Sequence, residues 1–398
     1  MNQPPLTGIT VLSLEHAIAA PLCTRQLAEL GARVIKVERR ETGDFARHYD
    51  DRVEGLCSHF VWTNRSKESL TLDIKQPAAA EVLKRLLART DVLVQNLAPA
   101  AAERTGLSYA KLSLDYPRLI VCDISGYGDR GPWREKKAYD LLMQAEAGFL
   151  SVTGDGEAMV KSGISIADIA AASQAHAAIL AALIQRGRTG KGSHIAISLL
   201  EAMAEWMGFP LYYAYAGNPP PPRSGADHAS IYPYGVFVAG DGKTLLLGIQ
   251  NEREWRAFCA EILAEILGHP SLAEDARFAG NAARSQNRGE LRELIVQAFA
   301  KLDSAALTAR LDAAGIAWAN VNDMAAVWEH PQLKALERFV EVGSPAGPIT
   351  ALKPPGNDSS YEPRIGPIPE VGEHTESILR ELGYSEPEIR ELSRNKVI

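Results

Sequence analysis

Short apolar runs and amphipathic segments alternate along the N-terminal half of the chain. Residues 9–14 and 33–38 are predicted to form buried strands, with a helix over residues 23–30 between them. The alternation continues with predicted strands at 91–95, 118–123 and 194–198, and with predicted helices at 78–87, near Leu112, at 169–183 and at 200–207. Strands that alternate with helices form a mostly parallel sheet. The pattern therefore predicts an α/β fold.

A run of four prolines, Pro219 to Pro222, interrupts this alternation. Such a run is stiff and extended, and it is a candidate linker between domains. Beyond it, two apolar runs within residues 236–247 flank a Gly-Asp-Gly turn and predict a β-hairpin, which helices follow. These segments predict a smaller α+β unit. The Pro- and Gly-rich stretch 345–369 is expected to follow the surface before a final helix over residues 375–382.

The composition is that of an ordinary globular chain, with 398 residues of which 46% are hydrophobic and 23% charged. The net charge of −7 argues against broad nucleic-acid binding, which needs a basic surplus. The N-terminus lacks a basic region followed by an apolar stretch, and no run of about 18 apolar residues is present, so we expect a cytoplasmic protein without a membrane span. The cysteines show no zinc-ligand pattern, and we expect reduced thiols and no metal site; they are Cys23, Cys57, Cys122 and Cys259.

Parallel sheets bind ligands at the carboxyl ends of their strands. The loops that follow the predicted strands are therefore expected to lie near one another; they begin at Glu15, Arg39, Asn96 and Ser125. The first of these loops, from Glu15 to Pro21, contains no glycine, so a dinucleotide pyrophosphate could not approach a helix terminus there in the usual way. A nicotinamide or flavin site of the usual kind is not expected.

Four cations lie near this predicted edge of the sheet: Arg39, Lys75, Arg104 and Lys137. Each one alone would be interpreted as a solvated surface charge. Together they would suit a ligand with several phosphates, because guanidinium groups match phosphate oxygens and ammonium groups supply mobile point charges. Coenzyme A is such a ligand.

Asp168 stands directly before the predicted alanine-rich helix, in a stretch with few other polar groups. Aspartate is a favoured N-cap residue, because its carboxylate accepts backbone N–H bonds from the first helical turn. A bend at a helix start can also orient a carboxylate nucleophile, and a closed site can remove its water. The segment by itself leaves both interpretations open.

Several blocks of the sequence resemble class III coenzyme A transferases. The resemblance covers nearly the whole chain, and the blocks match that family in order and spacing. They are Val34–Glu38, Gly43-Asp44, Asn64–Asp73, Asp91–Asn96, Ile124–Gly128, Gly131-Pro132, Ala138–Asp140, the approach to Asp168, Gly372–Thr375 and Leu382–Tyr384.

The resemblance implies a role for particular residues. Asp168 takes the position of the family's nucleophilic aspartate. The implied coenzyme A contacts are Arg39, Leu72, Lys75, Asn96, Leu97, Arg104 and Lys137, and His16 and Ile18 lie in the loop that lines the same pocket. Tyr139 is expected to support the nucleophile. No metal and no permanently bound cofactor are implied, because the coenzyme A thioester is the substrate.

The same resemblance implies an architecture. A Rossmann-like large domain is expected to combine residues 1–218 with a return segment, 331–398, and a smaller α+β domain to span residues 223–330. Two such subunits are expected to interlock as a homodimer, so that partner loops lie near Asp168. The implied partners are acyl-CoA and carboxylic acid substrates, without nucleic acid or membrane.

The implied reaction is transfer of coenzyme A from an acyl-CoA, succinyl-CoA in similar family members, to a small carboxylic acid. Dicarboxylates such as mesaconate, itaconate, malate or citramalate are the favoured acceptors. The polar loop 43–49, and Arg223 near His228, could hold the second carboxylate of such an acid. Ile18 replaces the Gln of formyl-CoA transferases, and the tetraglycine loop is missing, which argues against oxalate and formyl-CoA.

Two alternatives remain at this stage. An α-methylacyl-CoA racemase would share the fold, but those racemases carry a His-Asp pair where this chain has Tyr139-Asp140, and loss of the imidazole removes one of their two bases. A non-catalytic acyl-CoA-binding protein would use the same cations without turnover. Replacement of Asp168 distinguishes this binding protein from the enzyme, because only the enzyme has turnover to lose.

Overall fold

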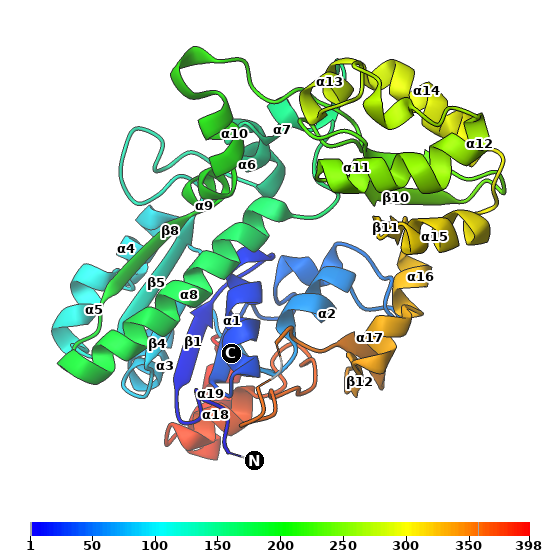
Figure 1. Cartoon of the computed structure of the whole chain (residues 1–398). Coiled ribbons are helices and arrows are strands. Elements are labelled where there is room, and N and C mark those ends of the chain that lie inside the picture. Colours follow the sequence, from blue (N-terminus) through cyan, green and yellow to red (C-terminus); the bar gives the residue numbers. More distant parts are fainter. Residues whose placement is uncertain (1, 357) are drawn as a thin grey trace. The chain divides into compact units, whose positions relative to one another are not determined.

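The computed structural model describes residues 2–356 and 358–398, and the chain forms two compact units (Figure 1). The larger unit consists of the residues up to Gly148 together with Ser162–Gly208 and Gln332–Ile398. The smaller unit consists of Phe149–Lys161 and Phe209–Pro331. The predicted boundaries had left residues 149–161 in the large domain.

The segment 149–161 joins the smaller unit through a short hairpin, β6 (Gly154–Asp155) and β7 (Ala158–Met159). Arg223 donates a hydrogen bond from Nε to the Gly156 carbonyl oxygen at 2.8 Å. The Gly225 N–H also donates to the Gly154 carbonyl oxygen at 2.7 Å. These contacts join residues that are far apart in the sequence, so the pattern of apolar residues could not predict them.

A six-stranded sheet forms the centre of the larger unit, with the strand order β3-β2-β1-β4-β5-β8. Every neighbouring pair is parallel, which confirms the predicted α/β fold with a parallel sheet. The strands are β1 (Thr10–Leu14), β2 (Arg33–Glu38), β3 (Lys67–Thr71), β4 (Val92–Gln95), β5 (Ile120–Ser125) and β8 (His194–Ser198). The strand order reverses direction between β1 and β4, and ligands of such sheets bind in the crevice at that switch.

Helices cover both faces of this sheet, which is why β1, β4 and β5 consist mostly of apolar residues. Figure 1 shows α1 (Ala19–Glu29) and α8 (Ile166–Thr189) on one face and α3 (Ala79–Leu87) on the other. Between α1 and α8 lie buried alanines, among them Ala170, which allow the helices to approach closely.

Helix α8 begins three residues before its predicted start, and Asp168 therefore lies inside its first turn. By length and composition alone, α8 is also apolar enough to cross a membrane, with a mean hydropathy of 1.5 over its most apolar window. It nevertheless carries polar residues such as His176, and it packs against α1, β5 and β8 in the larger unit.

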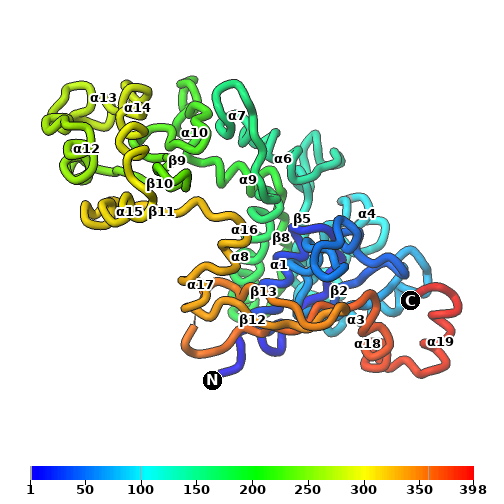
Figure 2. The backbone as a smooth tube through the Cα atoms, turned by 90° about the vertical axis from the view of Figure 1, so that its right-hand side faces the viewer, coloured from blue at the N-terminus to red at the C-terminus, as the bar shows by residue number. Residues whose placement is uncertain are grey.

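The C-terminal segment completes the larger unit. Helices α18 (Thr375–Glu381) and α19 (Glu386–Arg394) lie beside α3 in Figure 2, and Ile378, Leu379 and Ile389 share one apolar core with α3. The backbone N–H of Thr71 in β3 donates to Thr375 Oγ1 at 3.0 Å. The outer edge of the sheet is thus covered by residues from the other end of the chain.

The smaller unit contains a three-stranded antiparallel sheet in the order β11-β10-β9. Its strands are β9 (Tyr234–Val238), β10 (Thr244–Gly248) and β11 (Ala317–Asn320), so the predicted hairpin is confirmed and β11 is added to it. Helices α11 (Glu252–Phe258), α14 (Arg288–Phe299) and α15 (Ser304–Ala313) pack on the sheet. The core centres on Trp255, Phe258 and Phe299, which are almost fully buried.

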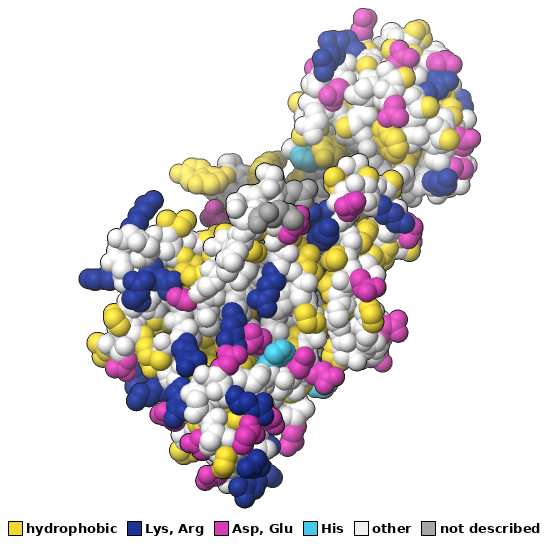
Figure 3. Space-filling model, turned by 90° about the horizontal axis from the view of Figure 1, so that it is seen from below, with side chains coloured by type: hydrophobic (Ala, Val, Ile, Leu, Met, Phe, Trp, Pro, Cys, Tyr) yellow, Lys and Arg dark blue, Asp and Glu magenta, His cyan; other side chains and the backbone are white. Residues whose placement is uncertain are grey.

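The surface seen in Figure 3 mixes both signs of charge. Lysine and arginine side chains lie among aspartate and glutamate side chains over that face. The net charge of the chain is −7. We therefore expect an anionic ligand to be recognised by a few local cations, and we do not expect recognition by a broad basic surface.

Candidate active site

A pair of residues joins the loops that follow β1 and β4 at the strand switch. The backbone N–H of His16, just after β1, donates to Asn96 Oδ1 at 3.2 Å. Asn96, just after β4, returns a bond from Nδ2 to the His16 carbonyl oxygen at 2.9 Å. Asn96 is a predicted coenzyme A contact, and its side chain holds the loop that begins at His16.

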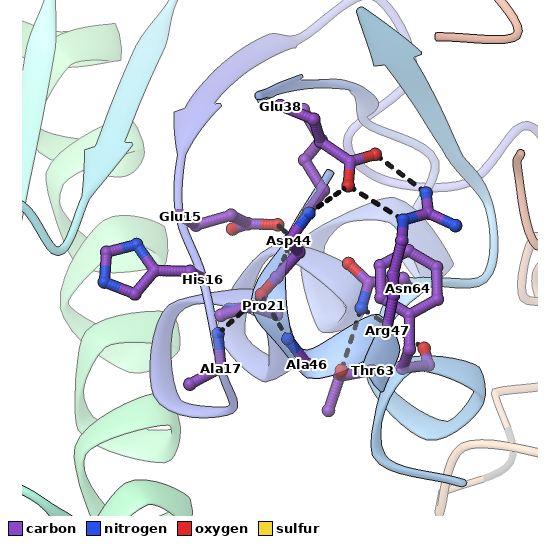
Figure 4. A network of polar contacts seen from close by, with 12 residues as sticks. Glu15, His16, Ala17, Pro21, Glu38, Asp44, Ala46, Arg47, Thr63 and Asn64 are labelled. Carbon is purple, nitrogen blue, oxygen red and sulfur yellow. Dashed lines mark hydrogen bonds and ion pairs between the residues drawn. The ribbon is translucent and has the colours of Figure 1, made fainter. Parts of the chain in front are cut away.

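The next residue of this loop, Ala17, has a left-handed backbone with φ of 64°. Such a conformation is rare for a residue other than glycine and persists only where neighbours hold it. The Ala17 N–H donates to Asp44 Oδ1 at 3.2 Å, and the same oxygen accepts the Ala46 N–H at 2.9 Å (Figure 4). Asp44 therefore fixes the loop, while the His16 ring points away from this network.

Below the loop lies a fully buried cluster of charges. Lys36 Nζ lies 2.7 Å from Asp44 Oδ2 and 3.5 Å from Glu15 Oε1. Lys67 Nζ lies 2.6 Å from the same Glu15 oxygen. The side chains of these four residues have no exposed surface. Burial would raise the pKa of Glu15, but the two ammonium groups outweigh it and lower that pKa.

A row of rings connects this loop to the surface beside it. The rings of His16 and Phe45 are 4.9 Å apart, and those of Phe45 and Tyr49 are 5.8 Å apart. The Arg39 guanidinium lies 6.0 Å from the Phe45 ring. Burial lowers the pKa of His16, so its imidazole is neutral at physiological pH. The fold thus brings the predicted site residues His16 and Arg39 to one place.

Asp168 lies in the first turn of α8, after the N-cap residue Ser165. The N-cap interpretation of Asp168 is therefore wrong. The capping carboxylate belongs to Asp140, at the start of α6 (Asp140–Glu146), because its Oδ1 accepts the N–H groups of Ala167 at 2.8 Å and of Asp168 at 3.3 Å. Burial, together with the Asp140 charge, raises the pKa of Asp168 from 3.8 to about 7.

The Tyr49 phenol connects Asp168 electrostatically to the His16 loop. Burial raises the pKa of Tyr49 to about 12, and the carboxylates of Asp44 and Asp168 add to that shift. Asp168 therefore lies within electrostatic range of the row of rings that begins at His16. A partly buried carboxylate with so perturbed a pKa is a candidate functional group.

The remaining predicted site residues divide by exposure. Leu72 is buried in the apolar core, Leu97 packs against that core, and Ile18 is buried as the N-cap of α1. Arg39, Lys75, Arg104 and Lys137 are exposed, and within the described residues none of them has an ion-pair partner. Tyr139 is 69% exposed. The cations are free to meet an anionic ligand, whereas the side chains of Leu72 and Ile18 serve the core.

The loop 43–49 was expected to offer a cation to a substrate carboxylate, and its main cation is already engaged. Arg47 forms a two-pronged ion pair with Glu38, at 2.8 and 2.9 Å. Arg223, in the smaller unit, donates to backbone carbonyl oxygens of Gly156 and Leu150. His48 stays exposed in this loop. In the described contacts, the loop 43–49 therefore has a structural role.

Sequence reasoning gave Asp140 no role of its own, and it placed Asp44 and Tyr49 only within the loop 43–49 that could hold a substrate carboxylate. One signal was present for the network: Lys36 and Glu38 stand beside Ile35 and Val37 in the otherwise apolar run 34–38. A charge at such a position must be paired, because an unpaired buried charge is too costly. No comparable signal marked Asp140, whose partners lie 27 and 28 residues away.

The raised pKa of Asp168 predicts how stability changes with pH. The folded chain binds the Asp168 proton more tightly than the unfolded chain, so this contribution is fully present below about pH 4 and is lost as pH rises through about 7. Asp168→Asn removes the ionisation. We expect the variant to exceed the wild type by about 2–4 kcal/mol in free energy of unfolding at pH 8, with a clearly smaller gap at pH 5. Urea unfolding of both proteins measures it, and a gap independent of pH contradicts the assignment.

A parallel sheet with a switch-point loop and a partly buried carboxylate of raised pKa are features of an α/β enzyme with a candidate carboxylate nucleophile. The family model of CoA-transferase family III matches residues 6–375. The chain belongs to CoA-transferase family III. The predicted family and enzyme class are therefore confirmed, and the racemase and binding-protein alternatives give way.

Known relatives align along almost all of the chain. The chain is 33% identical to a succinyl-CoA:glutarate CoA-transferase of Mus musculus, over 100% of this chain and 91% of the relative. It is 33% identical to a succinate–glutarate CoA-transferase of Agrobacterium fabrum, over 96% of each chain. Among solved structures, a CAIB/BAIF family protein from Brucella suis superimposes with a TM-score of 0.85 at 32% identity, over 96% of this chain and 100% of that chain.

Proposed function

We propose that this chain moves coenzyme A from succinyl-CoA to a small dicarboxylate, with Asp168 as the nucleophile. The observation that carries the proposal is the partly buried Asp168, whose pKa is raised to about 7 and whose charge acts on Tyr49, in the row of rings that begins at His16. A carboxylate held away from water is a stronger nucleophile than a solvated one. At neutral pH a large fraction of it is ionised and able to attack.

The choice of substrates rests on relatives. Two of them, in mouse and Agrobacterium fabrum, are named for succinate or succinyl-CoA and glutarate. Two relatives of Chloroflexus aurantiacus, each 28% identical to this chain, are named for succinyl-CoA with L-malate and with D-citramalate. Dicarboxylates are common to these names, and glutarate joins malate and citramalate among the acceptors that we propose.

In the proposed reaction, an Asp168 carboxylate oxygen attacks the thioester carbonyl carbon of the donor. The carbon–sulfur bond breaks, coenzyme A leaves as a thiolate, and a mixed aspartyl anhydride remains. The thiolate then attacks the aspartyl carbonyl carbon, and the donor acid leaves as its carboxylate. The acceptor carboxylate attacks the resulting aspartyl thioester, and the thiolate finally takes the acceptor acyl group, which restores the Asp168 carboxylate.

Other residues support these steps in the proposal. Asp140 fixes the first turn of α8 through the N–H groups of Ala167 and Asp168, and so aims the nucleophile. Burial lowers the pKa of His16, so its ring stays neutral and adds no charge beside the coenzyme A thiolate. The unpaired cations at the carboxyl edge bind coenzyme A phosphates; they are Arg39, Lys75, Arg104 and Lys137.

A homodimer is part of the proposal, as the family resemblance implies. Two apolar surfaces are available for it, one in each unit. In the larger unit Ile184 of α8 is 60% exposed, and in the smaller unit Phe209 and Tyr212 of α10 (Gly208–Tyr213) are 60% and 80% exposed. We expect light scattering of the purified protein to give twice the mass of one chain, and a monomeric mass with full activity contradicts the proposal.

One mixture experiment tests the substrate class. The purified protein is incubated with succinyl-CoA and glutarate, malate, citramalate, mesaconate and itaconate together, and each new acyl-CoA is identified by mass spectrometry. We expect at least one dicarboxylyl-CoA, with free succinate formed in equal amount because the exchange is one for one. Free coenzyme A without a new thioester would indicate hydrolysis and overturn the proposed transfer to these acids.

A further inference from the structure

We propose that Asp50, Cys57 and His59 form a binding site for a thiol-seeking divalent cation of the zinc class, with a fourth position open to water. The three residues lie in the larger unit, in the loop that leads into α2 (Ser58–Asn64) and in its first turn. Cys57 is the N-cap residue of α2. The sequence had predicted no metal site, because the ligands follow no known zinc spacing.

The separation of the ligand atoms fits a tetrahedral ion. Cys57 Sγ lies 3.6 Å from Asp50 Oδ2, and His59 Nδ1 lies 3.5 Å from the same oxygen. All three ligand atoms lie within 4.8 Å of one another. A tetrahedral zinc ion, with bonds of about 2.0 Å to nitrogen and oxygen and about 2.3 Å to sulfur, separates its ligands by about 3.3–3.6 Å. Two of the three separations therefore match a tetrahedral ion, and the third pair, Cys57 Sγ and His59 Nδ1, lies within 4.8 Å.

The chemistry of the three groups also fits. The Cys57 thiol now donates a hydrogen bond to Asp50 Oδ2, so the ion would take the place of the thiol proton, which leaves to solvent. His59 Nδ1 is buried and has no hydrogen-bond partner among the described residues, and its lone pair can bind the ion. One thiolate and one carboxylate then balance the two charges of the ion.

The site is held in place before an ion binds. Asp50 Oδ1 accepts the backbone N–H of Ser58 at 2.8 Å, and Oδ2 accepts the Ser58 hydroxyl at 2.6 Å. These bonds fix the carboxylate against the start of α2. The Cys57 side chain is buried, while that of His59 is 39% exposed, so an ion can reach the ligands from solvent on the His59 side. Rigid ligands with an entry path favour binding.

Occupation of this site would also reach the candidate nucleophile, a consequence that rests on the proposed function. The His59 ring meets the Tyr49 ring edge-on, with centroids 5.6 Å apart. Tyr49 lies within electrostatic range of Asp168. An ion that fixes His59 adds positive charge near that carboxylate and restricts Tyr49, so we expect zinc to inhibit coenzyme A transfer reversibly.

Cobalt(II) is the probe for the site, because it takes zinc positions and gives visible and near-ultraviolet absorption. The reduced, metal-free protein is titrated with cobalt. We expect one ion per chain, a thiolate-to-cobalt charge-transfer band and the intense visible bands of a tetrahedral ion, all removed by added zinc. Wild-type protein without the charge-transfer band at millimolar cobalt overturns the proposal.

Three variants make this test specific. His59→Phe keeps a ring against Tyr49 and removes the nitrogen, and we expect at least 100-fold weaker cobalt binding. Cys57→Ala should lose the charge-transfer band, whereas Cys259→Ala, which removes a buried thiol of the smaller unit, should match the wild type. Unchanged affinity in His59→Phe overturns the site, and this variant serves even if Cys57→Ala fails to fold.

The coenzyme A transfer assay distinguishes metal binding at this site from the inhibition that we expect it to cause. Zinc should inhibit the wild type and Cys259→Ala, and it should leave Cys57→Ala and His59→Phe active. Cobalt binding in a protein that transfers no coenzyme A would support the metal site and refute the proposed function. If the protein binds cobalt but keeps full transfer activity in the presence of zinc, the proposed link through Tyr49 is overturned.

Discussion

Replacement of Asp168 by asparagine is expected to lower coenzyme A transfer by at least about 10⁴-fold while coenzyme A still binds. Asparagine has nearly the same shape as aspartate, so the first turn of α8 and the Asp140 contacts should persist. Its amide cannot form the anhydride or the thioester on which the proposed route depends. Steady-state rates with succinyl-CoA and the acceptor found in the mixture experiment measure the loss.

Two further measurements keep this prediction specific. The wild type, mixed with succinyl-CoA and no acceptor, should carry covalently bound coenzyme A in its intact mass, and Asp168→Asn should not. Asp115→Asn changes an exposed aspartate at the end of α5 (Tyr109–Asp115) and should transfer at the wild-type rate. A transfer rate in Asp168→Asn within tenfold of the wild type would remove the covalent mechanism.

Lys36→Met is expected to lower the free energy of unfolding by about 3–5 kcal/mol. Methionine fills most of the volume of the lysine stem, so the loss comes from charge. Without the Lys36 ammonium, no lysine or arginine of the described residues pairs with Asp44 within 4 Å, and Glu15 keeps Lys67 as its cationic partner there. A buried carboxylate without a partner is strongly destabilising. Denaturant unfolding followed by circular dichroism measures the change.

Controls for the Lys36 prediction use a matched exposed pair and a second site. Arg85→Met breaks an exposed i,i+4 pair with Glu81 on α3 and should change stability little. Lys36→Met combined with Asp44→Asn should recover part of the loss, because the orphaned carboxylate is neutralised. If Lys36→Met unfolds at the same denaturant concentration as the wild type, the buried cluster does not stabilise the fold.

Apolar runs predicted the central strands well, whereas a strand rich in polar residues was not predicted. The predicted bounds of β2 and β8 are those of the structure. Strand β3 was not predicted, because Lys67-Glu68-Ser69 has no apolar period. Its buried lysine is tolerated through bonds to Glu15, Pro21 and Asn64, which are distant in sequence or lie outside the strand. Helix α19 was missed for a related reason: apart from Ile389 and a few neighbours, it is charged on most of its surface.

The site was predictable where chemistry follows chain order, and it escaped prediction where it depends on tertiary contacts. Strand ends placed His16, Arg39 and Asn96 at one edge, as the parallel order requires. The clamp of Asn96 on His16 joins residues 80 apart in sequence, and no local pattern reports it. The roles of the predicted coenzyme A contacts and of Asp168 stay predictions.

The contact between β3 and α18 has a consequence for synthesis on the ribosome. Strand β3 emerges early, but Thr375, its edge partner, follows 304 residues later. Until then the outer strand shows unpaired backbone groups and an apolar flank, which are features that recruit chaperones and promote aggregation. The nascent chain therefore carries its most association-prone edge through nearly all of translation, and C-terminal truncation is expected to yield insoluble protein.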